Sequence, residues 1–223
     1  SNHYEATFYL GTLYGQCNNF EMALKWLNKA RKIRPSDVHV HINLGNALKE
    51  LKKYDQSINS YERAIDIDPS ILFAHNNLGI VLKEQLKYTQ AIKCFEKVIE
   101  LNPNYLTAYN NLGTIFGELK IFSKAKNYYE KALKIDPNYA ASYYNLGIIF
   151  QELGYYKKSC WYYNQAIKLQ PNHADAHNNL GIILQEQGEF EKAKVSYEKA
   201  IESDPKNLSY LFQLSGLKKE VLN

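Results

Sequence analysis

Features typical of membrane proteins, secreted proteins and zinc proteins are missing from this chain of 223 residues. No apolar run approaches the roughly 20 residues that a membrane-spanning helix needs, and no signal peptide opens the chain. The three cysteines, Cys17, Cys94 and Cys160, form no CxxC pair, so neither a zinc site nor a disulfide framework is indicated. We expect buried thiols in a reducing compartment, and hence a protein of the cytoplasm or nucleus without a membrane partner.

Sequence signatures of catalysis are missing too. The chain has no Gly-rich phosphate loop, no HExxH pattern and no recognisable Ser/His/Asp set. Its net charge of +4 is modest, and its lysines are scattered along predicted helices instead of being grouped in blocks. The sequence therefore predicts no enzyme activity for this chain, no cofactor, no metal and no nucleic-acid partner.

What the chain does have is a repeat of 34 residues. Glycine recurs at this spacing at Gly11, Gly45, Gly79, Gly113, Gly147 and Gly181, and proline at Pro35, Pro69, Pro103, Pro137, Pro171 and Pro205. The period divides the chain into six repeats (4–37, 38–71, 72–105, 106–139, 140–173 and 174–207) and a remainder, 208–223. Because a repeat array buries its core between neighbouring units, we expect one elongated domain.

Each repeat carries two apolar patterns of helical period. With the repeat 106–139 numbered from 1 to 34, positions 4, 7, 8 and 11 share one face of a first helix, helix A. Positions 20, 24 and 27 of a second helix, helix B, hold a small, a large and a small residue, as in Ala125, Tyr129 and Ala132. A glycine inside a helix costs ~1 kcal/mol relative to alanine, so the glycine at position 8 predicts close packing of helix A on helix B.

Residues that end helices stand between these patterns. Gly154 and Gly188 at position 15 suit the left-handed conformation that closes a helix, although the other repeats have Asn18, Lys52, Leu86 and Lys120 there. Proline at position 32 ends helix B, and the residue after it is expected to cap the next helix A. These candidate caps are Ser36, Ser70, Asn104, Asn138 and Asn172.

The two ends of the chain depart from the repeat. Ser1 and Asn2 stand almost inside a predicted helix with no initiator methionine, so we expect them to be foreign residues and the chain to be a piece of a longer protein. Residues 208–223 stay amphipathic up to Leu222, but Ser215 replaces the glycine of position 8. This segment is predicted to be a capping helix or helix A of a truncated seventh repeat. An apolar face exposed at either end would favour self-association.

Together, the period, Leu-Gly at positions 7 and 8, Ala or Ser at 20, an aromatic residue at 24, Ala at 27 and Pro at 32 resemble the tetratricopeptide repeat family over residues 4–207. The resemblance implies an all-α fold, a right-handed superhelical solenoid of helix–turn–helix repeats. It also implies that helices A line the concave side and that the chain is a scaffold for protein–protein interaction.

Polar residues recur on the face of helix A opposite its apolar stripe, at positions 2, 6, 9 and 13, which we call the groove face. Five consecutive repeats have asparagine at position 6 (Asn43, Asn77, Asn111, Asn145 and Asn179) and glutamate at position 13 (Glu50, Glu84, Glu118, Glu152 and Glu186). Asn76, Asn110 and Asn178 at position 5 extend the polar surface, and Phe73, Ile80, Ile148 and Ile182 could add apolar pockets.

Helix propensity does not favour asparagine, so we expect the position-6 amides to line a peptide-binding groove. The alternatives are that the amides only bond to the neighbouring helix or survive from duplication, and that the glutamates are solvated or pair with lysines. Three histidines, His41, His75 and His177, share position 4 with Tyr109 and Tyr143. We expect them to replace an aromatic ring at the edge of the core, since ligands one repeat apart do not converge on a metal.

Two kinds of tetratricopeptide protein bear on the choice of partner. Phrases such as Asn76-Asn77-Leu78-Gly79 resemble the repeat region that precedes the catalytic domain of O-GlcNAc transferases, which implies that the asparagines hold extended or disordered polypeptides. The carboxylate clamp of chaperone adaptors needs lysine at positions 5 and 2 and arginine at position 6, and none stands there. A non-catalytic adaptor of a multiprotein assembly is the other hypothesis, and a glycosyltransferase domain beyond Asn223 would decide between them.

Overall fold

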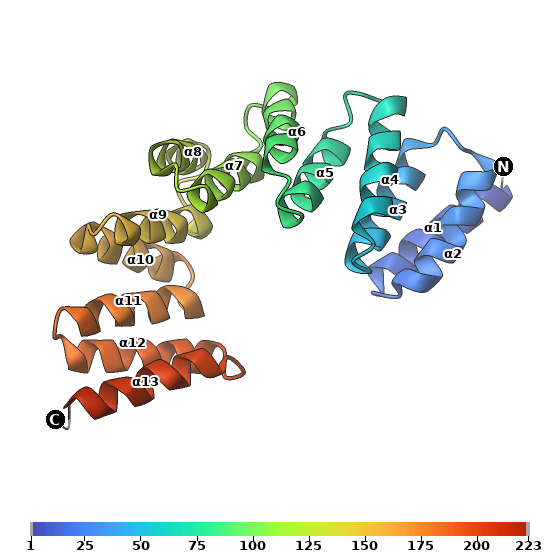
Figure 1. The fold of residues 1–223 in the computed structure, drawn as a ribbon. Helices are drawn as coiled ribbons and strands as arrows, with labels where there is room; N and C mark the ends of the chain where they lie inside the picture. The colour runs from blue at the N-terminus through green and yellow to red at the C-terminus, as the bar shows by residue number, and fades with distance from the viewer. Residues whose placement is uncertain (1, 222–223) are drawn as a thin grey trace. The chain divides into compact units, whose positions relative to one another are not determined.

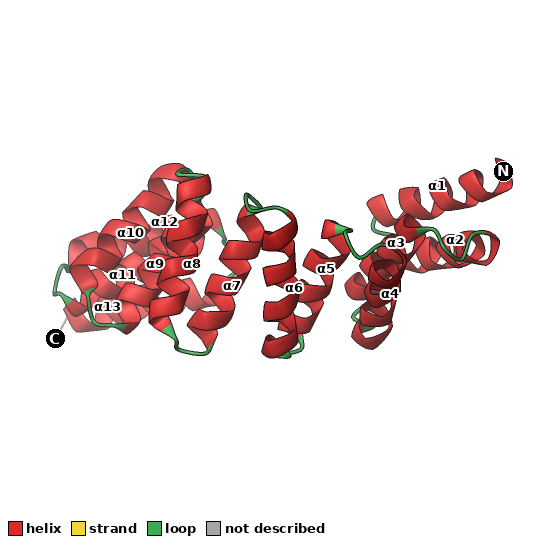
Figure 2. Ribbon diagram, turned by 90° about the horizontal axis from the view of Figure 1, so that it is seen from above, coloured by secondary structure: helices red, strands yellow, loops and turns green. Residues whose placement is uncertain are grey.

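The computed structural model describes residues 2–221, with the side chains of residues 3–217. These residues form thirteen helices and no strand, so the predicted all-α fold is confirmed for them (Figure 2). The helices are α1 (Asn2–Gln16), α2 (Phe20–Ile33), α3 (Val38–Glu50), α4 (Tyr54–Ile67), α5 (Leu72–Glu84), α6 (Tyr88–Leu101), α7 (Leu106–Glu118), α8 (Phe122–Ile135), α9 (Ala140–Glu152), α10 (Tyr156–Leu169), α11 (Ala174–Glu186), α12 (Phe190–Ser203) and α13 (Leu208–Val221). Ser1 and Leu222, both named in the sequence predictions, lie outside the described residues.

The helices group into two compact units, Ser1–Ile115 and Phe116–Asn223, with a boundary inside α7. In the first unit α1 packs on α2, α3 on α4 and α5 on α6, while α2 and α4 each contact the helix that follows (Figure 1). In the second unit α9 packs on α10 and α11 on α12, while α8, α10 and α12 each contact the helix that follows. Odd-numbered helices up to α11 are helices A, and α1 contacts α3 as α3 contacts α5.

The glycine at position 8 makes room for the ring at position 24 of the same repeat. A Cβ atom on Gly45 would lie 2.5 Å from the Tyr61 ring, and one on Gly147 would lie 2.5 Å from the Tyr163 ring, closer than side-chain carbons approach. Both rings are fully buried. The recurring glycine thus has the packing reason that the sequence predicts, because only a residue without a side chain lets helix B come this near.

Serine at position 20 forms a hydrogen bond across the same close contact between helices A and B. The hydroxyl of Ser57 donates to the carbonyl oxygen of Gly45 at 2.8 Å, and the hydroxyl of Ser159 donates to that of Gly147 at 2.7 Å. Both serines are completely buried. Their hydroxyls cause no penalty for burial because each one has a partner.

The residue at position 15 is left-handed in all six repeats. Its φ angle is +75° at Gly154 and +76° at Gly188, but also +57° at Lys52 and +56° at Leu86. Asn18 and Lys120 have the same conformation, with φ of +57°. The turn between helices A and B therefore imposes this conformation whichever residue stands there, and side chains other than glycine adopt it at a steric cost.

The prediction that the residue after proline caps the next helix A is wrong. The N-cap of α3 is Asp37, whose side chain accepts from the backbone N–H groups of His39 and Val40, and that of α11 is His173. Ser70, Asn104 and Asn138 instead donate their backbone N–H to the side-chain oxygen two residues earlier, on Asp68, Asn102 and Asp136, at 2.9 to 3.0 Å. An Asp or Asn before the proline thus forms an Asx turn, and helix A begins two residues after the predicted cap.

The last described helix, α13, has one buried and one exposed side. It packs on α11 and α12, with Leu217 buried beside Ala193 and Tyr197 and Leu214 partly buried against the same cluster. Leu208 and Phe212 are 74% and 76% exposed. One face of α13 therefore covers the last repeat, and the other presents apolar side chains to solvent.

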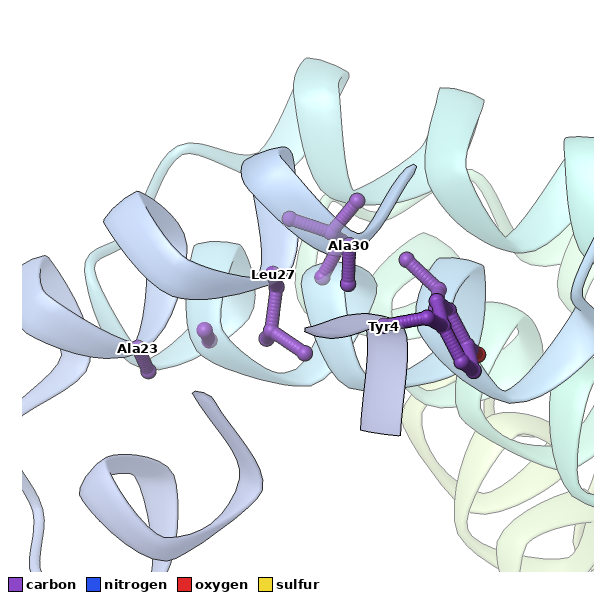
Figure 3. Close-up of a cluster of buried hydrophobic side chains, with 7 residues drawn as sticks. Tyr4, Ala23, Leu27 and Ala30 are labelled. Atoms are coloured by element: carbon purple, nitrogen blue, oxygen red, sulfur yellow. The ribbon is translucent and has the colours of Figure 1, made fainter. Parts of the chain in front are cut away.

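The first repeat has an aliphatic residue where the other five have a ring. Leu27 at position 24 is buried between Ala23 and Ala30 of its own helix and packs with Tyr4 of α1 (Figure 3). Val40, Leu44 and Ala47 of α3 complete this cluster. The core of the first repeat is thus continuous with the second, although its central side chain is smaller.

Candidate functional site

The position-6 asparagines lie on helices A, with much of each side chain covered. Asn111 is 9% exposed, and the other four are half-buried. A half-buried amide has room for a ligand on one side only. The hydrogen bonds on its covered side therefore decide which donors and acceptors remain for a ligand.

In the first unit each of these asparagines bonds to helix A of the preceding repeat. Asn43 Nδ2 donates to Thr12 Oγ1 on α1 at 2.9 Å, and Asn77 Nδ2 donates to Asn46 Oδ1 on α3 at 3.0 Å. Asn111 Oδ1 accepts from Lys83 Nζ on α5 at 3.2 Å. We call these contacts the seam bonds, because they join neighbouring helices A along the groove face.

The second unit repeats the arrangement at Asn179. Its Nδ2 donates to the hydroxyls of Tyr144 on α9 and Tyr163 on α10, each at 3.4 Å. Burial, followed by the nearby Asp175 carboxylate, raises the pKa of Tyr144 to about 12, so its hydroxyl stays protonated at neutral pH. The position-6 amide is thus tied to the previous repeat in both units.

Core tyrosines at position 24 donate hydrogen bonds to side chains of helix A at positions 9 and 12. Tyr61 donates to Asn46 Oδ1 at 2.7 Å, Tyr163 to Gln151 Oε1 at 2.7 Å and Tyr197 to Gln185 Oε1 at 2.8 Å. Burial raises the pKa of Tyr61 and Tyr163 far above the ordinary value, which keeps both as donors. Phe95 at the same position has no hydroxyl, and in that repeat Lys83 reaches the next asparagine instead.

Asn76 and Asn178 at position 5 bond to the position-6 asparagines beside them more than they extend the polar surface. Asn76 Nδ2 donates to Asn77 Oδ1 at 3.1 Å, and Asn178 Nδ2 donates to Asn179 Oδ1 at 3.3 Å. Asn76 is only 7% exposed, and the Oδ1 atoms of Asn76 and Asn178 are buried without a hydrogen bond. Asn110 is half-buried. The predicted polar flank is therefore largely covered at Asn76.

The glutamates of position 13 lie at the exposed end of each helix A. Glu50 pairs with the neighbouring Lys49 at 2.9 Å, an exposed contact of small energetic value. Glu84, Glu118, Glu152 and Glu186 are exposed. Among the predicted apolar groove residues Phe73 is 60% exposed, whereas Ile80, Ile148 and Ile182 are half-buried. The groove face thus combines fixed amides with exposed carboxylates and a few apolar side chains.

The position-4 histidines form hydrogen bonds to the backbone where one repeat meets the next. His41, His75 and His177 each place Nε2 at 2.8 to 2.9 Å from the carbonyl oxygen of the proline six residues earlier. Tyr109 donates from its hydroxyl to the equivalent carbonyl of Pro103 at 3.0 Å. A carbonyl only accepts, so Nε2 carries the proton and the histidines replace a tyrosine, as expected.

Residues 2–221 contain no group of three or more His, Cys, Asp or Glu placed to hold a metal ion. Within the same span, every helix is too short or too polar to cross a bilayer.

Sequence reasoning missed the residues that hold the asparagines. Thr12 and Asn46 stand at position 9 and Lys83 at position 12, while Gln151 and Gln185 at position 12 bond to the core tyrosines. A signal was present, since both positions hold polar residues in several repeats on the side facing the next helix A. Its meaning depends on which neighbour each side chain reaches, and that requires the packed structure.

Family models described as tetratricopeptide repeats match most of the chain. They cover residues 5–37, 45–85, 70–138, 128–159, 156–188 and 174–207. A comparison with curated proteins gives no match.

Solved structures share the fold over much of the chain. PilF of Pseudomonas aeruginosa is 22% identical, with a TM-score of 0.80 over 98% of both chains. MamA from Desulfovibrio magneticus RS-1 is 19% identical, with a TM-score of 0.71 over 78% of this chain and 98% of its own. YrrB, described as a TPR protein with an unusual peptide-binding site, is 24% identical, with a TM-score of 0.61 over 83% of this chain and 96% of its own.

Proposed function

Because this chain belongs to the tetratricopeptide repeat family, a family of protein-interaction scaffolds, we propose that it binds extended polypeptides along its groove face through the position-6 asparagines. The observation that carries the proposal is the set of seam bonds, which hold the amides of Asn43, Asn77, Asn111 and Asn179 in fixed orientations. An amide that is already fixed loses little rotational freedom when a ligand binds it.

The amide of Asn43 keeps capacity for a ligand after its seam bond is made. A side-chain amide has two N–H donors and an oxygen with two lone pairs. At Asn43, one Nδ2 donor bonds to Thr12, and Oδ1 accepts no hydrogen bond from the described residues. Structural bonding to the neighbouring helix and recognition of a peptide group are therefore compatible at one side chain.

The spacing of the repeats suits an extended ligand. Packed helices lie about 10 Å apart, and an extended chain advances ~3.3 Å per residue, so one asparagine would meet every third residue. Contacts to peptide groups read the backbone and accept many sequences. The exposed glutamates at position 13 would then favour ligands with basic side chains.

The test is titration of dephosphorylated casein, as a disordered polypeptide, against a variant with Asn77→Ala, Asn111→Ala and Asn145→Ala. Each bond contributes ~0.5–1.5 kcal/mol, so affinity should fall about ten- to a thousandfold. The matched control carries Asn59→Ala and Asn127→Ala, two exposed asparagines of helices B. Circular dichroism checks that both variants stay folded, and undiminished affinity in the triple variant overturns the proposal.

A second variant separates the glutamates from the asparagines. Replacing Glu84, Glu118 and Glu152 by glutamine should reduce the preference for basic peptides and flatten the salt dependence of binding, while the amides are retained. An unchanged salt dependence would show that the glutamates are only solvated.

We also propose that the array is the substrate-recognition region of a protein similar to the O-GlcNAc transferases. The support is the recurrence of Asn-Asn-Leu-Gly in the third, fourth and sixth repeats. A non-catalytic adaptor would use the same groove face with no transferase attached. The full-length protein decides, because a glycosyltransferase domain after Asn223 that transfers GlcNAc from UDP-GlcNAc to casein would exclude the adaptor.

A further inference from the structure

A pocket of about 300 Å³ opens on the groove face among α1, α2 and α3, inside the first unit. Its apolar wall includes Gly11, Gly15, Ala23 and Leu27, and its polar rim is formed by Thr12, Gln16, Asn43, Asn46 and Glu50. We call it the first-repeat pocket. Three of its rim residues stand at positions 6, 9 and 13 of the second repeat, so the pocket lies on the surface proposed to bind polypeptides.

Two residues of the first repeat are smaller than their counterparts in most other repeats, and this leaves the space open. Leu27 stands at position 24, where the other repeats have a ring, and Gly15 stands at position 12. In the fifth and sixth repeats a tyrosine at position 24 donates to a glutamine at position 12, through Tyr163 and Gln151 and through Tyr197 and Gln185. The first repeat lacks both the hydroxyl end of the ring and the amide that receives it.

The fourth repeat has only one of these two smaller residues. It also has glycine at position 12, Gly117, but Tyr129 at position 24 keeps its ring and is 3% exposed. A Cβ atom on Gly117 would lie 3.6 Å from Ile149 Cδ1 and 4.0 Å from the Tyr129 hydroxyl. On Gly15 the nearest atom would be Ala23 Cβ at 3.9 Å, so the space beside Gly15 has fewer close neighbours than the space beside Gly117.

The rim of the first-repeat pocket favours a neutral ligand group that donates a hydrogen bond. Among the described residues no lysine, arginine or histidine lines it, and Glu50 is the one charged residue that does. Gln16, Asn43 and Glu50 supply side-chain oxygens, and Asn43 Oδ1 accepts no hydrogen bond from the described residues. A ring with a terminal hydroxyl offers an apolar body to the wall and a donor to these oxygens.

We propose that the first-repeat pocket receives a tyrosine side chain of the bound polypeptide. The ligand would place the outer end of its ring beside Leu27, on the side of Gly15, and give its hydroxyl to an amide oxygen, as Tyr61 gives its hydroxyl to Asn46. The proposal rests on the proposed function for the rest of the ligand, but the pocket itself can be tested alone. It adds a preferred residue, and hence a register, to a groove whose asparagines read only the backbone of the ligand.

The first experiment titrates N-acetyl-tyrosine amide into the ¹⁵N-labelled protein and follows the amide signals of Gly11, Gly15, Asn43 and Asn46 by NMR. N-acetyl-alanine amide and N-acetyl-phenylalanine amide are the comparison ligands. We expect binding of the tyrosine amide on the order of millimolar, because a ligand this small gains little contact. Equal shifts with the alanine amide would overturn the pocket, and equal affinity for the phenylalanine amide would overturn the role of the hydroxyl.

The variant for this experiment is Gly15→Gln, which restores the residue of the fifth and sixth repeats. The space around Gly15 accepts a side chain, and glutamine favours a helix more than glycine does, so the variant should fold. We expect it to bind the tyrosine amide at least tenfold more weakly. Gly117→Gln, at the same position of the fourth repeat, is the matched control and should bind like the original chain. Retained binding in Gly15→Gln contradicts the proposal.

Two otherwise identical extended peptides, one with tyrosine and one with alanine at a single position, separate the pocket from the groove. A preference for the tyrosine peptide that Gly15→Gln abolishes supports both proposals. Equal binding of the two peptides supports the groove and overturns the pocket. Binding of the tyrosine amide with no binding of either peptide supports the pocket and overturns the polypeptide groove.

Discussion

The buried hydroxyl of Tyr61 and the side chain of Asn46 are joined at 2.7 Å, and the same Asn46 oxygen accepts from Asn77 at 3.0 Å. A side chain that cannot touch a ligand therefore helps to orient an amide of the next repeat. The chemistry of the groove face depends on the core beneath it.

Tyr61→Phe should test this dependence. The ring would keep its contact with Gly45 while its hydrogen bond is lost, so the free energy of unfolding should fall by ~0.5–1.5 kcal/mol. Affinity for casein should fall as well, although Tyr61 is fully buried. Urea denaturation and titration measure the two effects, with Tyr54→Phe at the start of the same helix as the control. A loss of stability without a loss of affinity would separate the core from the groove.

Leu86→Gly should stabilise the protein. Leu86 adopts a φ of +56° and its side chain is 70% exposed, so glycine would relieve the backbone without removing buried contacts. The left-handed conformation costs leucine roughly 1–2 kcal/mol and the entropy that glycine loses on folding costs about 0.5–1 kcal/mol, so we expect a net gain of about 0.5–1 kcal/mol in the free energy of unfolding. Leu86→Ala is the control, because it removes the side chain but keeps the steric cost. Equal stability of the two variants in urea would contradict the prediction.

Stability should decline as the pH rises above 10. Burial raises the pKa of Tyr144 to about 12 and raises those of Tyr61 and Tyr163 further, whereas an unfolded chain loses its tyrosine protons near pH 10. The folded state then holds more protons than the unfolded state, so this contribution is complete below pH 10 and declines above it, and the part that comes from Tyr144 is lost by about pH 12. Urea denaturation at pH 9, 10 and 11 measures the slope. Tyr144→Phe should reduce it by up to one proton, and an unchanged slope would count against the burial of that hydroxyl.

The exposed side of α13 should promote self-association of this polypeptide. Leu208, Leu211 and Phe212 are 44% to 76% exposed and lie on one short segment. Sedimentation velocity should show association that rises with concentration and is reduced by Leu211→Ser and Phe212→Ser. The partly or fully buried Leu214 and Leu217 are poor targets, because polar residues there would damage the packing on α12. A monomer at every concentration would contradict the prediction, because it would show that α13 exposes these side chains to water without association.

The helix hairpins could be predicted from the sequence because each one is specified by local pattern. The glycine at position 8 and the ring at position 24 identify the contact between helices A and B, and the proline marks the end of helix B. The caps could not be predicted in the same way. Asp68 and Asn102 compete with Ser70 and Asn104 for the same turn, and only backbone geometry shows which side chain reaches an N–H group.

The candidate site was predicted as a set of residues but not as a network. The position-6 asparagines are visible as a period, whereas the partners of Asn77 and Asn179 lie 31 and 35 residues away and differ in chemistry. The first-repeat pocket was missed because it arises from what Leu27 and Gly15 lack, and an absence leaves no motif to search for.

The seam bonds also make the groove face responsive to mechanical strain. A hydrogen bond such as that between Asn77 and Asn46 weakens steeply once its atoms separate by a few tenths of an ångström beyond 3.0 Å. Tension that spreads neighbouring helices A would therefore release these amides before it unfolds either helix, because packing and backbone hydrogen bonds hold each helix separately. A unit under load would present more free donors and acceptors than one at rest, and its attraction for a polypeptide would change with the force upon it.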